Sequence, residues 1–337
     1  MTLSVIIITL KRHKELARCL ACLDEQQPHP DQVVVVDASP DDLSRRVAEQ
    51  HNASRVLNVT YVRNDIGGFQ TQSRNISLHH ATGDILAFLD DDSYVHEGWC
   101  RELLKTYAAD ANIVAVGGRA LNSVEGEADE GVDKIGKLDE NGGLHGYFAA
   151  DPKKIIDVDH LIGCNMSIRR DIMAKLGGFR EGFPGISGVR EETDVFMRIR
   201  QLPGRIVFNP NVVATHIGAS QAIGRRFDLR YEYYNQRNHL VMLISNFGFP
   251  CAIVQRYLVT NSRHFIERFP QRLFRRERHP IVVVASVGVY FAATVLGLIS
   301  GIKLLKSRGL SPMRHDEQAQ KIRDLLKQSP HSSDTER

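Results

Sequence analysis

The chain has 337 residues, an ordinary globular composition and a formal net charge of only +3 at pH 7. So small a net charge argues against a nucleic-acid-binding protein unless the basic residues are clustered, and they cluster only near the C-terminus. The length is sufficient for one large α/β domain with an appendage, or for two modest domains.

The cysteines and the N-terminal sequence both indicate an intracellular setting. There are five cysteines, and Cys19 and Cys22 lie one helical turn apart without a second close pair that would complete a zinc site. We expect these two to pack in the core of a protein kept in a reducing compartment. The sequence begins directly with a strand pattern and lacks a charged region followed by a cleavage site, so no secretory signal is expected.

The N-terminal half alternates strand and helix patterns. Residues 4–9 and 32–36 are continuous apolar, β-branched runs, which suit strands buried on both faces of a parallel sheet. Leucines at helical spacing separate them, and shorter strands are predicted at 59–62 and 85–89, with a helix over 70–81. This order predicts an α/β fold with an open, mostly parallel sheet flanked by helices.

Polar residues follow the predicted strands at the edge where ligands bind in such sheets. These residues are Thr9, Asp37, Asn64, Asp90, Asp91 and Asp92. Alternate side chains of a strand share a side, so Asp90 and Asp92 can converge while Asp91 faces away or binds something else. Like charges gathered in this way usually need a cation, and carboxylate oxygens favour Mg²⁺ or Mn²⁺ together with substrate phosphates. The alternative is a solvated acidic turn that caps the next helix.

Two common nucleotide-binding motifs are missing. The sequence has no Gly-x-Gly-x-x-Gly after the first predicted strand and no Walker lysine loop, which disfavours dinucleotide oxidoreductases and P-loop enzymes. A nucleotide held by carboxylates and a metal ion remains compatible with the pattern.

The chain changes character after the acidic run. Residues 121–154 are rich in Gly, Asp and Glu and predict a long loop or lid over an active site, or simply a tolerated insertion. The segment VREETDVFMRIR predicts a helix with Glu191, Asp194 and Arg198 on one face. The helix macrodipole alone partly explains acidic residues at its start. His216, between an apolar run and a glycine, would by itself be assigned to the core.

Taken together, several ordered segments resemble the inverting family 2 glycosyltransferases of the GT-A fold, especially bacterial rhamnosyltransferase-like and galactofuranosyltransferase-like members. The segments are SVIIITLKRHKELARCLACLDEQ, VVVVDAS, RNDIGGFQTQSRNISLHHATGDILAFLDDD, GCNMSIRR, GGF, EETD and THIG, between Leu3 and Gly218. Motifs in a fixed order are far more specific than any one of them. The resemblance implies a GT-A catalytic domain over 1–220, with a nucleotide-binding half at 1–120 and an acceptor and base half at 121–220.

The resemblance also implies roles for single residues. The residues expected to bind the nucleoside-diphosphate sugar are Thr9, Arg12, Asp37, Arg74, Asp90, Asp91, Gly163 and Asn165. The expected ligands of Mn²⁺ or Mg²⁺ are Asp90, Asp92 and His216. Such an ion would neutralise the departing diphosphate, and a base on the opposite face would deprotonate an acceptor hydroxyl, which inverts the anomeric centre in one displacement.

The general base is expected in the EETD motif. The family usually has Glu-Asp at the first two positions, whereas here Glu192 replaces the aspartate. One extra methylene moves a carboxylate by about 1 Å or more, which matters for proton transfer. We expect Glu192 to be the base, with Glu191 as the second choice and Asp194 as a further catalytic candidate.

The C-terminal third predicts a helical, membrane-associated region over 221–310. Residues 281–302 form an uncharged apolar run of about 22 residues, long enough to span a bilayer and flanked on both sides by basic residues. Its small residues also permit an interfacial helix, and a buried core helix is the remaining alternative. We expect a peripheral or single-pass protein at the cytoplasmic side of the membrane, acting on a glycan or lipid-linked glycan. Residues 311–337 are polar and expected to be disordered, except for an amphipathic piece near Ile322.

Two competing functions remain open at this stage. A nucleotidyltransferase also joins an α/β sheet to carboxylate-bound Mg²⁺, but its phosphate-binding loop would need glycines that Thr9-Leu10-Lys11-Arg12 lacks. A catalytically silent sugar-nucleotide-binding scaffold of the same fold is the other, and the intact acidic motifs argue against it. The aromatic and basic segment that follows residue 225 is expected to pack beside the catalytic domain and not to bind nucleic acid.

Overall fold

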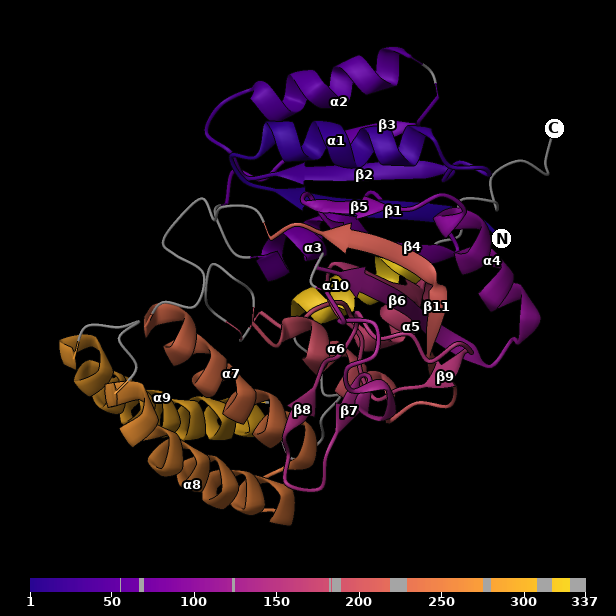
Figure 1. The fold of residues 1–337 in the computed structure, drawn as a ribbon. Coiled ribbons are helices and arrows are strands. Elements are labelled where there is room, and N and C mark those ends of the chain that lie inside the picture. Colours follow the sequence, from indigo (N-terminus) through magenta and orange to yellow (C-terminus); the bar gives the residue numbers. More distant parts are fainter. Residues whose placement is uncertain are drawn as a thin grey trace.

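Figure 1 shows the computed structural model of the chain. The structure describes residues 1–54, 56–66, 70–122, 125–181, 183, 189–218, 229–274, 280–307 and 317–327. The strands of the main sheet are β1 (Leu3–Thr9), β2 (Gln32–Asp37), β3 (Val59–Arg63), β4 (Ile85–Asp90), β5 (Ser93–Val95), β6 (Ile113–Leu121), β9 (Ile156–Asp157), β10 (Asn165–Arg169) and β11 (Arg205–His216). A short hairpin consists of β7 (Lys137–Leu138) and β8 (Leu144–His145).

The main sheet is mixed, with a parallel half and a half that contains reversed strands. Its order is β3-β2-β1-β4-β10-β6-β11-β5, with β9 paired beside β11. Strands β3, β2, β1 and β4 are parallel, as the alternation of strand and helix patterns predicts. Strand β10 is antiparallel to both β4 and β6, and β5 is antiparallel to β11. The predicted α/β class is therefore confirmed, with reversed strands in the second half.

Ten α-helices are described around this sheet. They are α1 (His13–Asp24), α2 (Leu43–Ala53), α3 (Gln70–Leu78), α4 (Trp99–Ala109), α5 (Arg170–Leu176), α6 (Glu191–Ile199), α7 (Leu229–Phe247), α8 (Ala252–Phe274), α9 (Pro280–Ser307) and α10 (Glu317–Lys327). In Figure 1 the first two helices lie above the sheet, and α7, α8 and α9 gather at the lower left. The predicted helix over 70–81 is slightly shorter than expected and ends at Leu78.

Strand β1 explains how one apolar run supports two cores. Leu3, Val5 and Ile7 belong to a buried cluster with residues of α1, α2 and α4, whereas Ile6 and Ile8 belong to a second cluster with residues of α3, α5, α6 and α10. Alternate side chains of a strand point to opposite faces, so a strand covered on both faces must be apolar throughout. Cys19 is buried in the first cluster and Cys22 packs against it, which confirms the prediction for these two residues.

Much of the segment at 121–154, predicted as a long loop or lid, is folded onto the rest of the molecule. It contains the β7–β8 hairpin and a 3₁₀ turn at Val132–Lys134, and Ile135 and Phe148 are buried in the core. The hairpin turn is held by the helical region, because His239 Nε2 contacts the Gly142 carbonyl at 2.7 Å. Residues 123–124 lie outside the described residues.

The C-terminal helices form a third apolar cluster beside the sheet. Helices α7, α8 and α9 pack on one another, and α9 runs along α7. Among the described residues, one stretch, Val284–Lys306 in α9, is long and apolar enough to cross a membrane, and only 22% of it is buried. A buried core helix therefore does not describe this segment.

The chain returns to the sheet domain after α9. Helix α10 packs against α5 and α3, with Ile322 and Leu326 buried in the core, so the amphipathic piece expected near Ile322 forms a helix. Residues 311–316 and 328–337 of the predicted disordered tail lie outside the described residues, as do 275–279 of the basic flank before the apolar run.

Candidate active site

The carboxyl ends of three neighbouring parallel strands bring the predicted nucleotide-binding residues to one edge of the sheet. The register pairs Thr9 at the end of β1 with Asp37 at the end of β2. It also pairs Ile8 with Asp90 at the end of β4. Parallel strands that stop at the same level deliver their terminal side chains to a common edge, which is where ligands bind in α/β sheets.

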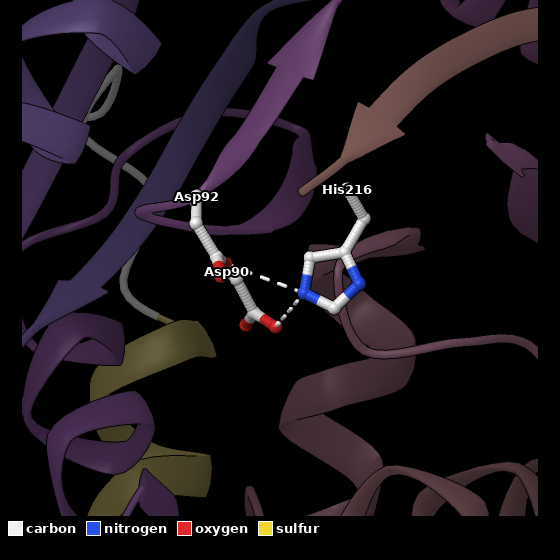
Figure 2. A group of neighbouring side chains, drawn as sticks. All are labelled: Asp90, Asp92 and His216. Carbon is white, nitrogen blue, oxygen red and sulfur yellow. Dashed lines mark ion pairs between the residues drawn. The ribbon is translucent and has the colours of Figure 1, made fainter. Parts of the chain in front are cut away.

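Asp90, Asp92 and His216 form a possible metal site, drawn in Figure 2. Their ligand atoms all lie within 4.8 Å of one another. His216 Nε2 is 3.3 Å from Asp92 Oδ1 and 3.9 Å from Asp90 Oδ2. The antiparallel pairing of β5 and β11 places His216 opposite Ser93, directly beside the acidic run. The sheet therefore brings His216 beside two carboxylates that precede it by more than 120 residues in the sequence.

The chemistry of these groups fits a divalent cation. Asp90 Oδ1 is buried and has no hydrogen-bond partner among the described residues, and it forms an ion pair with Arg74 Nη2 at 3.5 Å, so a bound cation would satisfy it further. Two carboxylates supply hard oxygen ligands and the imidazole supplies a nitrogen, a combination that suits Mn²⁺. The side chain of Asp92 is 3% exposed and that of Asp90 is 24% exposed, so one ligand is enclosed and the other faces outward.

The middle carboxylate of the run has partners other than the metal-site residues, as predicted, but β4 ends at Asp90, and Asp91 and Asp92 lie in a turn and not in a strand. Thr9 Oγ1 donates to Asp91 at 2.8 Å and Arg12 Nη1 donates to the same carboxylate at 2.9 Å. Arg12 Nη1 also lies 3.3 Å from Asp92 Oδ2. Burial raises the pKa of Asp91 to about 7, although the Arg12 guanidinium opposes the shift. Thr9 and Arg12 thus hold the acidic run in place, and Arg12 contacts both Asp91 and the metal-site residue Asp92.

Arg74 links the metal site to the start of helix α6. It is 3% exposed, and its Nη1 donates to Glu191 Oε1 at 2.8 Å while its Nη2 lies 3.5 Å from Asp90 Oδ1. Nη2 also donates to the Gly163 carbonyl at 3.5 Å. A Cβ added at Gly163 would approach Nη2 to 2.9 Å, so a side chain there would crowd the guanidinium. The arginine is a buried bridge between the metal site and the EETD motif.

The two glutamates of the EETD motif have different surroundings. Glu191 is 2% exposed and carries the contact to Arg74, whereas Glu192 is half-buried and remains accessible. Burial, followed by the neighbouring charge of Glu192, raises the pKa of Glu191 well above its usual value, and Arg74 counters this only in part. A base must meet its acceptor, so accessibility favours Glu192.

Asp194, the third candidate of the motif, is fully buried within the framework. Arg180 Nη1 donates to its Oδ1 at 2.8 Å, and Asn246 Nδ2 donates to the same oxygen at 2.7 Å. Arg198 Nε lies 3.1 Å from Oδ2, which is the i,i+4 pair expected from the helical spacing. The carboxylate joins α6 to α7 and to the segment before α6.

Asp37 and Asn165, two further predicted donor-binding residues, are also buried. Asp37 accepts hydrogen bonds from the Ser39 backbone N–H at 2.8 Å and from the Tyr61 hydroxyl at 2.9 Å. Asn165 accepts from Trp99 Nε1 at 2.9 Å, and its amide N–H groups donate to two backbone carbonyls at 2.8 and 3.0 Å. The Asn165 side chain therefore ties β10 to its neighbours, while Asp37 lies at the strand edge.

Residues that the sequence interpretation missed surround Asp37. Tyr61 and Arg63 follow one another on alternate positions of β3, and Arg63 Nη1 lies 3.8 Å from Asp37 Oδ2. The parallel register pairs Arg63 directly with Asp37. The rule that ligands bind at the carboxyl edge would have drawn attention to this strand end as well.

A mixed α/β sheet with an Asp-x-Asp-type run and a histidine at its carboxyl edge is the arrangement expected of the GT-A fold. The model of glycosyl transferase family 2 matches residues 4–177, more than half of the chain. The chain therefore belongs to glycosyltransferase family 2, and the family prediction is confirmed. Nothing in the match distinguishes a rhamnosyl or galactofuranosyl specificity.

Characterised relatives act in glycan synthesis. A glucosyl-dolichyl phosphate glucuronosyltransferase of Haloferax volcanii is 27% identical over 64% of this chain and 69% of its own length. The succinoglycan biosynthesis protein ExoM of Rhizobium meliloti is 29% identical over 59% of this chain and 62% of its own length. Chondroitin synthase of Escherichia coli is 34% identical, but the match spans only 35% of this chain and 17% of that much longer protein.

Solved structures support the same fold. TarS residues 1–349 of S. aureus in complex with UDP-GlcNAc aligns with a TM-score of 0.56 and 16% identity, over 96% of this chain and 91% of that chain. The mannosyltransferase PcManGT of Pyrobaculum calidifontis, in complex with GDP-Man and Mn²⁺, aligns with a TM-score of 0.55 and 17% identity, over 91% and 87% of the two chains. At these identities the likeness concerns the fold alone.

Proposed function

We propose that this chain is a metal-dependent inverting glycosyltransferase that moves a sugar from a nucleoside-diphosphate sugar to a hydroxyl of a glycan or lipid-linked glycan. The observation that carries the proposal is the Asp90, Asp92 and His216 cluster, which lies at the carboxyl edge of the sheet in a family 2 chain. The complexes of PcManGT with GDP-Man and Mn²⁺ and of TarS with UDP-GlcNAc support a metal-bound donor.

Different residues at this edge are assigned to the cation, the nucleotide base and the diphosphate of the donor. Asp90, Asp92 and His216 would hold the cation, which when bound supplies positive charge to the diphosphate leaving group. Mn²⁺ is the proposed ion, with Mg²⁺ as the alternative. Asp37, at the neighbouring strand end, is assigned to the nucleotide base. Arg74 lies 3.5 Å from Asp90 and supplies further positive charge beside the diphosphate.

Glu192 is assigned as the general base. It is accessible and adjacent to Glu191, whose contact with Arg74 fixes the first turn of α6 relative to the metal site. Glu192 takes the proton of the acceptor hydroxyl as its oxygen attacks the anomeric carbon, and the bond to the diphosphate breaks on the opposite face. Asp194 is assigned to the framework, because two guanidiniums and an amide already hold its buried carboxylate.

The substrate class follows from the relatives and from the resemblance of the motifs. Relatives named for dolichyl phosphate, succinoglycan and chondroitin support a glycan or lipid-linked glycan acceptor in polysaccharide synthesis. A rhamnosyl or galactofuranosyl donor is proposed on the motif resemblance. Reaction at the cytoplasmic face of a membrane is proposed on the apolar helix α9.

The experiment is a donor panel with a metal control. Release of free nucleoside diphosphate is measured from UDP-, dTDP- and GDP-sugars, including dTDP-rhamnose and UDP-galactofuranose, with Mn²⁺ or with EDTA. Asp92→Ala is compared with Asp171→Ala, which changes a carboxylate that is 62% exposed and that, among the described residues, pairs only with Lys175. We expect the wild type and Asp171→Ala to hydrolyse one donor slowly when Mn²⁺ is present. We expect no hydrolysis in EDTA and none by Asp92→Ala.

Donor-induced thermal stabilisation is recorded on the same plates. Stabilisation without release is the result expected of a transferase that requires its acceptor, and equally of the silent sugar-nucleotide-binding scaffold. Absence of both signals for every donor would contradict the proposal, and release that ignores EDTA and Asp92→Ala would contradict the assigned metal site.

A further inference from the structure

Helix α9 presents a continuous apolar face to solvent. The large residues of this face are Val284, Phe291, Val295, Leu296 and Ile299, which are 60%, 61%, 53%, 43% and 44% exposed. Val284, Phe291, Val295 and Ile299 are seven or four positions apart and Leu296 is three before Ile299, which places them on one broad side of the helix over about 22 Å of its length. A soluble monomer rarely leaves so long a row of large apolar side chains uncovered, so this face requires a partner.

The opposite face of α9 is packed against α7. Ala293 is fully buried, and a Cβ added at Gly297 would lie 3.0 Å from the Arg237 carbonyl oxygen. A Cβ at Gly301 would lie 2.9 Å from Ile244 Cβ. The small residues of the apolar run therefore permit close contact with α7, and the large ones face outward.

Both ends of α9 belong to the same folded unit, which is incompatible with a single membrane crossing. Before α9, helix α7 packs on α6 of the catalytic domain, and after it α10 packs on α5 and α3 of that domain. Only residues 308–316 join α9 to α10. Nine residues reach at most about 32 Å when fully extended. A bilayer with its headgroups is about 40 to 45 Å thick, so a chain that had crossed it could not return to α5.

The charge of the helical region complements an anionic surface. Residues 252–307 carry nine Lys and Arg against two Asp and Glu, a net +7, although the whole chain is only +3. The rest of the chain is therefore net negative, and Lys303 and Lys306 follow the apolar face of α9 and are exposed. Basic residues at the border of an apolar face are attracted to the anionic headgroups of a bilayer, whereas a protein partner would need no such excess.

We propose that α9 lies in the plane of the membrane surface, with Val284, Phe291, Val295, Leu296 and Ile299 inserted among the acyl chains of an anionic bilayer. The helix is thus an interfacial anchor and not a membrane span. This orientation keeps α7, α10 and the catalytic domain on one side of the membrane. The inference concerns lipid binding alone and does not depend on which sugar is transferred.

The experiment measures the depth of tryptophan probes along α9. The chain has one tryptophan, Trp99, which is 1% exposed and gives a constant background. The full-length variants Val284→Trp, Phe291→Trp and Ile299→Trp are mixed with phosphatidylglycerol vesicles whose acyl chains are brominated at shallow or deep positions. Val56→Trp, at a site 44% exposed between α2 and β3, is the control outside the membrane face.

An in-plane helix gives the three probes equal quenching, strongest from the shallow bromines, with no quenching of Val56→Trp. Quenching weakens several-fold in purely zwitterionic vesicles, because the basic residues then lose their partners. A spanning helix would instead place Phe291→Trp about 10 Å deeper than the other two, with strongest quenching from the deep bromines. That result, or no quenching at all in anionic vesicles, overturns the proposal, and no sugar donor is involved in either measurement.

Discussion

Separate substitutions of Glu191 and Glu192 test how the EETD motif divides its work. Glu192→Gln removes the proposed base without touching the Arg74 contact, which Glu191 makes at 2.8 Å. General-base catalysis contributes about 10²- to 10⁴-fold, so we expect kcat to fall by that factor, equivalent to about 3 to 5 kcal/mol. The KM for the donor and the melting temperature should change little, because Glu192 is not among the metal-site residues.

Glu191→Gln should have the opposite profile. It removes the charged partner of a guanidinium that is 3% exposed, and losing one partner of a buried pair costs about 3 to 5 kcal/mol. We expect the lower end of this cost for two reasons. Arg74 keeps two other partners, Asp90 and the Gly163 carbonyl, each at 3.5 Å. The substitution also removes the repulsion between the charges of Glu191 and Glu192. We expect a loss of about 3 kcal/mol in stability and a raised donor KM, with kcat reduced less than about tenfold.

The assay combines initial rates of transfer with urea unfolding of each variant. Glu192→Asp is the matched control, since it keeps a carboxylate and restores the residue usual in the family. We expect it to retain far more activity than Glu192→Gln. The reasoning is refuted if Glu191→Gln loses kcat at least 100-fold with unchanged stability while Glu192→Gln retains its rate, a pattern that would make Glu191 the base.

Two further predictions concern stability. Asp194→Asn should destabilise the chain by about 3 to 5 kcal/mol in urea, because it leaves two buried guanidiniums without their carboxylate, whereas Asp171→Asn at an exposed pair should change less than about 0.5 kcal/mol. Burial lowers the pKa of His160 to about 4 and of His239 to about 3, so below the unfolded pKa of about 6.5 the unfolded chain binds more protons and stability falls as the pH drops. Between pH 7.5 and 5.5, the free energy of unfolding of the double variant His160→Asn/His239→Gln should fall by about 3 kcal/mol less than that of the wild type. An equal fall in both proteins would contradict the conclusion that these two histidines are buried in the neutral form.

The sequence was sufficient to predict the parallel half of the fold and the acidic strand end. Continuous β-branched runs required strands covered on both faces. The predicted separation of Asp91 from Asp90 and Asp92 is also found, although Asp91 and Asp92 lie in a turn after β4 and not in the strand from which the prediction was made. These features depend on neighbours along the chain. Local pattern is therefore enough to describe them.

The partners of these residues depend on long-range pairing, which local pattern does not encode. The Arg74 contact with Glu191 joins positions 117 residues apart, and only the packing of α3 and α6 beneath the sheet reveals it. His216 reaches Asp92 through the antiparallel pairing of β11 with β5, whereas spacing alone assigned the histidine to the core. The family resemblance, and not periodicity, led to it.

The same distinction applies to α9. Its length and hydropathy are those of a membrane span, and the sequence left a span and an interfacial helix both open. The position of α10 on α5 is the observation on which we propose the interfacial helix, because both flanking segments pack on the same domain. A short helix after the apolar run was thus the informative element.

The central claim is that Asp90, Asp92 and His216 bind a divalent cation together with a nucleoside diphosphate. The EPR signal of free Mn²⁺ tests this claim most directly. Mn²⁺ is titrated into the wild type, Asp92→Ala and Asp171→Ala, with and without the nucleoside diphosphate of the preferred donor. We predict that the wild type and Asp171→Ala bind one Mn²⁺, more tightly when the diphosphate is present, and that Asp92→Ala does not. Equal binding by Asp92→Ala and the wild type, or no binding with the diphosphate present, would contradict the account.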